Sequence, residues 1–88
     1  MPKQRKNALA AVGMPLAAVS SCPRIEILGN REVVIEGCRG VAEYSEEVIR
    51  LNVAGGSLGF LGKGLEIINL CGDEARLSGI LEKIEFCL

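Results

Sequence analysis

Residues 24–53 read RIEILGNREVVIEGCRGVAEYSEEVIRLNV, and this stretch decides the fold class. Its clearest segment is VIRLNV at 48–53, in which three apolar side chains fall on one face and polar ones on the other. Such alternation is typical of a half-buried strand, because successive side chains of a strand point to opposite sides of the sheet. The same period recurs on both sides of Gly29-Asn30, a dipeptide that favours a two-residue hairpin turn. The stretch therefore predicts short strands joined by tight turns.

The pattern continues to the end of the sequence. Turn residues stand at 54–56 (AGG), 62–64 (GKG) and 71–74 (CGDE), and Gly79 marks a bulge in the final stretch. Turns about every 8–12 residues indicate an all-β fold, and no segment after residue 23 has the period of a helix. We expect one small all-β domain of about six to eight short, mostly antiparallel strands, arranged as a curved sheet, roll or small sandwich.

A second geometry remains open. The segments 58–60, 65–67 and 77–80 recur with neighbouring glycines, as the rungs of a short β-solenoid would. Dipeptide turns favour hairpins over this alternative.

The first 22 residues have a different character and divide the chain into a segment 1–22 and a β domain 23–88. A basic start is followed by an apolar, alanine-rich run from residue 8 to residue 19 and by two serines before Cys22. One interpretation is a short N-terminal helix ended by Gly13. The other is a secretory signal whose last residues resemble a lipoprotein cleavage box, with Cys22 as the anchored residue. Periodicity alone does not choose between them.

Residues 23–86 resemble the YabP/YqfC family of sporulation proteins, in its YqfC-like branch. The resemblance is carried by PRIE at 23–26, GNRE at 29–32 and EYSEE at 43–47, then by LGFLGKGLEIINL at 58–70 and LSGILEKIEF at 77–86. The alanine-rich start, Cys22 and Gly59 depart from the family pattern.

The resemblance implies a protein of endospore formation in a Gram-positive bacterium. It would be made in the mother cell and act while the spore envelope, cortex and coat, is built. Members are often encoded beside a membrane protein of the same programme, and the resemblance brings no catalytic residues. It also favours the N-terminal helix, and with it a location in the mother-cell cytoplasm or at the periphery of a membrane. The alternative is an exported protein with the same β body, anchored by lipid at Cys22.

Composition argues against several function classes. The chain has no histidine, and so lacks the most common general base and the most common zinc ligand. Its 10 Lys+Arg are balanced by 11 Asp+Glu, and aromatic residues make up 3%, which does not suit nucleic-acid binding. We expect a protein that is not an enzyme, takes no cofactor and binds neither nucleic acid nor a small-molecule substrate.

The remaining reactive groups also have simpler explanations. The cysteines show no C-x-x-C pair, so reduced thiols are favoured over disulfides and over a metal site. The carboxylate pairs Glu46-Glu47 and Asp73-Glu74 fall at predicted turns, where solvated charges are ordinary. The four cysteines are Cys22, Cys38, Cys71 and Cys87.

The expected mode of action is therefore protein binding. Arginine and tyrosine are over-represented at interfaces, and the candidate partner-contact residues are Arg24, Arg39, Tyr44 and Arg50. An ordinary solvated sheet face is the alternative explanation for them. We expect a protein partner, for which an integral membrane protein of the sporulation programme is the candidate. Unpaired sheet edges offer a route to self-association.

Overall fold

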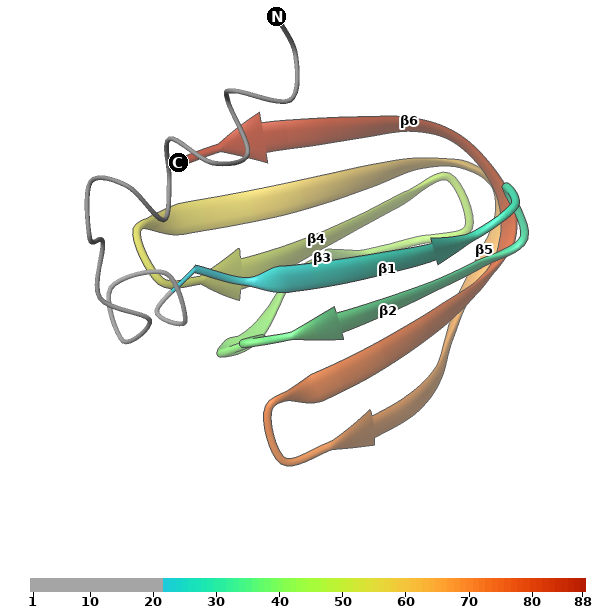
Figure 1. The fold of residues 1–88 in the computed structure, drawn as a ribbon. Coiled ribbons are helices and arrows are strands. Elements are labelled where there is room, and N and C mark those ends of the chain that lie inside the picture. Colours follow the sequence, from blue (N-terminus) through green and yellow to red (C-terminus); the bar gives the residue numbers. More distant parts are fainter. Residues whose placement is uncertain (1–21) are drawn as a thin grey trace, which may run out of the picture.

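The computed structural model describes residues 22–88, which form six strands of one antiparallel sheet (Figure 1). The sheet order is β1-β2-β6-β5-β4-β3, and every pairing is antiparallel. This confirms the all-β prediction and excludes the solenoid. The helix expected before Cys22 lies outside the described residues. The strands are β1 (Arg24–Leu28), β2 (Glu32–Glu36), β3 (Gly40–Tyr44), β4 (Val48–Val53), β5 (Gly56–Cys71) and β6 (Glu74–Cys87).

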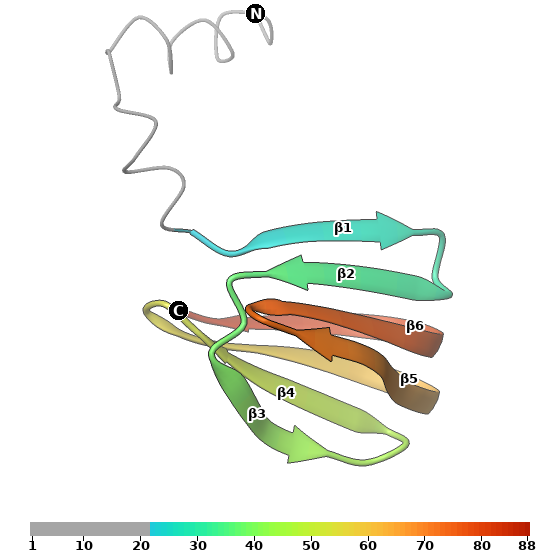
Figure 2. The ribbon, with the colours of Figure 1, turned by 90° about the horizontal axis from the view of Figure 1, so that it is seen from below.

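The long hairpin of β5 and β6 is the central element, and it contributes to two layers. On β5, only residues 56–61 pair with β4. On β6, only residues 74–78 pair with β2. These two stretches lie at opposite ends of the hairpin. The hairpin curves between its ends, so that the sheet folds over itself, with β1-β2 in one layer and β3-β4 in the other (Figures 1 and 2).

The bend coincides with Gly62-Lys63-Gly64, where the sequence predicts a turn. That prediction was wrong, because β5 continues through these residues with register shifts against β6. A Cβ at Gly62 would lie 1.9 Å from the carbonyl oxygen of Ile80, so the two strands approach each other closely only because residue 62 is glycine. Gly79 lies at the same bend with φ of 131°; the register shifts there as predicted, but the extra residue is on β5, where residues 64 and 65 stand opposite Gly79.

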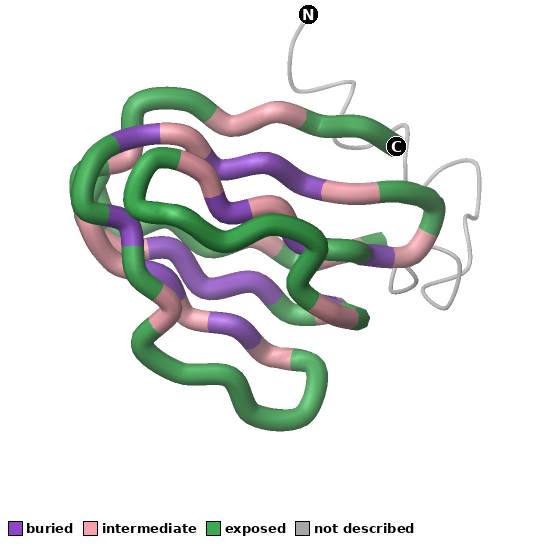
Figure 3. Tube along the Cα trace, turned by 180° about the vertical axis from the view of Figure 1, so that it is seen from behind, coloured by how far each residue is buried: buried purple, intermediate pink, exposed green. Residues whose placement is uncertain are grey.

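The hydrophobic core lies between the two layers. The alternation in residues 48–53 is confirmed, with Ile49, Leu51 and Val53 all buried, and they face the buried Val33 and Ile35 of β2. Figure 3 shows buried stretches running along the inner strands, whereas the outermost strands are largely exposed. The other core residues are Cys38, Leu58, Phe60, Leu65, Ala75 and Leu77.

The first hairpin turn is centred on Gly29-Asn30 as predicted, and the Arg31 N–H donates to the Leu28 carbonyl at 3.3 Å. Strand pairing begins with Leu28 and Glu32, so the loop includes Arg31 as a third residue. Gly29 has φ of 60°, a left-handed conformation that glycine adopts without a steric penalty. Among residues 22–88, no helix is long and apolar enough to cross a membrane.

Candidate interaction surfaces

Unpaired strand edges are the first candidate surfaces. Within the described domain, the outer edges of β1 and β3 are free. So are the later halves of β5 and β6, because β4 and β2 do not extend along them. A free edge presents backbone N–H and C=O groups that another strand can pair with.

Three of these edges carry features that oppose strand addition. β3 has a register irregularity between Val41 and Glu43, and a bulge of this kind turns an edge away from flat pairing. The N–H of Ile67, on the later half of β5, donates to the Tyr44 hydroxyl at 3.0 Å. β1 is only five residues long and carries charges at Arg24 and Glu26.

The later half of β6 also carries charges, at Glu82, Lys83 and Glu85, and its register against β5 shifts at Glu82, but from Lys83 to Cys87 its pairing with β5 is regular. The N–H of Leu81 donates to the carbonyl of Asn30 at 2.7 Å, and the pairing with β2 stops at Ser78. Beyond Leu81, the strand runs to Cys87 with β5 on one side and no strand of the described chain on the other (Figure 1).

Exposed apolar side chains accompany these edges. Phe86 pairs with the buried Leu58 and so points to the inner face of the sheet, yet it is 62% exposed. Ile27 shares the inner face through its pairing with Val33 and is 48% exposed. Both were expected inside the core. The remaining exposed large apolar residues are Leu28, Val41, Tyr44, Ile68, Leu70, Ile80 and Leu88.

The four residues expected to contact a partner do not lie together. Arg24 lies on β1 in one layer, 4.0 Å from Glu36, with a side chain that is 73% exposed. Arg39 is exposed in the connection between β2 and β3. Tyr44 pairs with the buried Ile49 and so lies toward the inner face, where its hydroxyl accepts the hydrogen bond from β5 described above.

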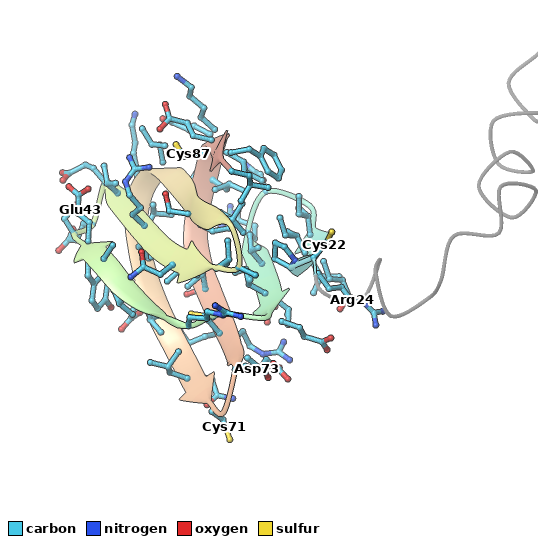
Figure 4. All side chains as sticks on the ribbon, turned by 90° about the vertical axis from the view of Figure 1, so that its left-hand side faces the viewer. Cys22, Arg24, Glu43, Cys71, Asp73 and Cys87 are labelled. Carbon is cyan, nitrogen blue, oxygen red and sulfur yellow. The ribbon has the colours of Figure 1, made fainter. Side chains whose placement is uncertain are left out.

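Arg50 lies on the outer face of the other layer and is engaged within the chain. Its guanidinium lies 3.6 Å from Glu43 on β3 and 3.5 Å from Glu85 on β6. To reach Glu85 it crosses β5 at Gly59, where a Cβ would lie 2.9 Å from Nη1 of Arg50. Lys83 extends this charge cluster, 3.4 Å from Glu85. Figure 4 shows Glu43 and Arg24 on opposite sides of the domain.

A second charge cluster lies on the outer face of the first layer. Nη1 of Arg76 donates to Oε2 of Glu32 at 2.6 Å, and Nη2 lies 3.8 Å from Glu74. The hydrogen bond to Glu32, followed by the nearby negative charges, raises the pKa of Arg76 above its usual value. Neither cluster was predicted from the sequence, although the alternation of the strands places the charged residues of both clusters on outward-facing positions.

The reactive groups are dispersed. Cys38 is buried, and its Sγ lies 3.6 Å from the Gly40 carbonyl, whereas Cys22, Cys71 and Cys87 are exposed and far apart (Figure 4). Across residues 22–88, no three cysteine or carboxylate side chains are placed to hold a metal ion. A hollow of about 510 Å³ opens to solvent beside Tyr44; its lining residues are Tyr44, Ser45, Glu46, Gly64, Leu65 and Glu66.

Comparison with known proteins agrees with the resemblance seen in the sequence. The model of the YabP family matches residues 21–87. The chain is also similar to the uncharacterized protein YqfC of Bacillus subtilis (strain 168), with 28% identity over 94% of this chain and 95% of that protein.

Proposed function

The chain belongs to the YabP family, and from this membership we propose that it is a non-catalytic interaction and assembly module of spore formation. In this proposal it acts in the mother cell while the spore envelope is built. Its partner is another protein, for which an integral membrane protein of the same programme is the candidate.

The observation that supports an interaction module is the exposed Phe86 on the open half of β6. An aromatic side chain left 62% exposed beside unpaired backbone groups combines the two features that a docking strand uses. Aromatic residues are enriched at the centres of protein interfaces, where they contribute much of the binding energy.

The test compares two exposed apolar residues at different places in the source organism. The variant Phe86→Ser removes the candidate anchor, and Leu70→Ser makes a similar change on the later half of β5, where Leu70 is 53% exposed. Surface changes of this kind alter the free energy of unfolding by about 0.5 kcal/mol. Both proteins should therefore fold, which thermal unfolding checks.

Heat-resistant spores are then counted for each variant and for a deletion of the gene. We expect the deletion and Phe86→Ser to lower spore yield, and Leu70→Ser to leave it near wild type. A deletion strain with normal spores would refute a role in spore formation.

Mass spectrometry of the native protein addresses its location. A diacylated N-terminus at Cys22 would replace the cytoplasmic proposal with that of an exported lipoprotein bearing the same domain.

A further inference from the structure

The open half of β6 carries a sequence that is complementary to itself. Lys83 and Glu85 point to the outer face, where they pair across the sheet with Leu61 and Gly59, and Ile84 between them packs on the core. When two copies of such a strand run antiparallel with Ile84 opposite Ile84, position 83 of each copy faces position 85 of the other. Lysine then meets glutamate at both places, and opposite charges directly across an antiparallel pair are stabilising.

We infer that the protein forms a symmetric dimer in which the β6 edges of two copies pair antiparallel about Ile84. This inference rests on the proposed function and names its first partner, a second copy of the same chain. The pairing makes one continuous sheet across the two-fold axis, and such an interface is self-complementary.

The register follows from the charges on this edge. Ile84 lies in the regular stretch from Lys83 to Cys87, beyond the register shift at Glu82, and pairing centred on Ile84 brings Lys83 of each copy to Glu85 of the other. Centring on Glu85 would place two glutamates opposite each other, and centring on Phe86 would place Glu85 opposite Cys87, so neither register brings a lysine to a glutamate.

The edge of β1 is less suitable for self-pairing. It has five residues, and pairing about its midpoint would place Glu26 opposite Glu26. Like charges directly opposite each other destabilise a strand pair. The free edges of β3 and β5 carry the bulge and the Tyr44 contact described above.

The sharpest test uses two charge reversals, each of which should weaken self-association alone, whereas a mixture of the two variants should restore it. In Lys83→Glu, positions 83 and 85 are both acidic, and in Glu85→Lys they are both basic. Two copies of the same variant therefore repel each other at these positions. A mixed pair of the two variants restores one lysine opposite each glutamate. Lys63→Glu is the matched control: it makes the same charge change on an exposed side chain of β5, 3.9 Å from Glu82, at a position that the proposed pairing does not use.

Sedimentation equilibrium of the full chain measures the dimer dissociation constant, and circular dichroism checks that each variant is folded. An interface limited to one strand pair is small, so the wild type should dimerise in roughly the micromolar range. We expect each reversal to weaken self-association about tenfold, since two attractive pairs become repulsive. An equimolar mixture should regain the wild-type constant, and Lys63→Glu should not change it.

A wild type that stays monomeric up to about 1 mM would overturn the inference, as would a mixture that associates no better than its components. A monomeric wild type together with spore loss in Phe86→Ser would leave the proposed function standing and indicate that a different protein pairs with this edge. Dimerisation as described, with normal spores in the deletion strain, would remove the function and keep the dimer.

Discussion

Gly62→Ala should destabilise the protein more than the same replacement at Gly64 or Gly40. The new Cβ would lie 1.9 Å from the carbonyl oxygen of Ile80 and 2.9 Å from its carbonyl carbon, so the strands must separate by about 1 Å. Both strands are fixed there by backbone hydrogen bonds: the Gly62 N–H donates to the Glu47 carbonyl oxygen at 3.0 Å, and the Leu81 N–H donates to the Asn30 carbonyl oxygen at 2.7 Å. Overpacking costs about 1–3 kcal/mol and more when rigid backbone must move, so we expect a loss of at least about 3 kcal/mol.

That loss is large for a domain of this size, whose free energy of unfolding is on the order of 5–10 kcal/mol. Thermal unfolding followed by circular dichroism should show a midpoint lower by about 12 °C or more. Gly64→Ala is one control: no atom lies within 4 Å of its Cβ position, and its φ of 59° should cost about 1 kcal/mol. Gly40→Ala is the second, with its nearest neighbour at 3.7 Å, and should change little. If Gly62→Ala proved no less stable than Gly64→Ala, the close approach would not be what requires glycine at the bend.

Tyr44→Phe removes the acceptor of the Ile67 N–H and should lower the free energy of unfolding by about 0.5–1.5 kcal/mol, with faster hydrogen exchange at the Ile67 amide; an unchanged exchange rate would contradict the contact. Alkylation of the folded protein should modify Cys22, Cys71 and Cys87, and should modify Cys38 only on unfolding, because Cys38 is 6% exposed. Intact-mass spectrometry over time checks this, and four cysteines reacting at one rate would show the burial of Cys38 to be wrong.

The strands were predictable where the sequence alternates without interruption. Residues 48–53 form β4 with the expected face inward, and Val33 and Ile35 are buried as their positions required. Alternation decides which face a side chain occupies, because it depends only on neighbouring residues.

Exposure on that face was not predictable. Ile27 and Phe86 point inward as expected but remain about half exposed or more, because coverage depends on where the short hairpins stop along β5 and β6. The interruption at 62–64 was misassigned for a related reason. Glycine serves a turn and a close approach of two strands equally well, and only the partner strand distinguishes the two.

The candidate site was predictable only in part. Arg50 was named as an outward residue, but its partner Glu85 lies 35 positions further along the chain and is reached across an intervening strand. No local pattern indicates that Gly59 leaves room for this contact. The open half of β6 could not be found either, since the sequence does not show where its pairing with β2 ends.

The fold-over of β5 and β6 also bears on how the chain folds during synthesis. β2 pairs with residues 74–78, about forty positions beyond it, so the β1-β2 hairpin has no layer to join until β6 has been made. Domains usually fold as units as they leave the ribosome, and an isolated two-stranded hairpin is marginal in water. The β1-β2 hairpin, although made first, therefore takes its place only after the β5-β6 hairpin has closed at Gly72-Asp73. Its apolar residues stay exposed throughout translation of the later strands, when a chaperone or a nearby nascent chain can reach them.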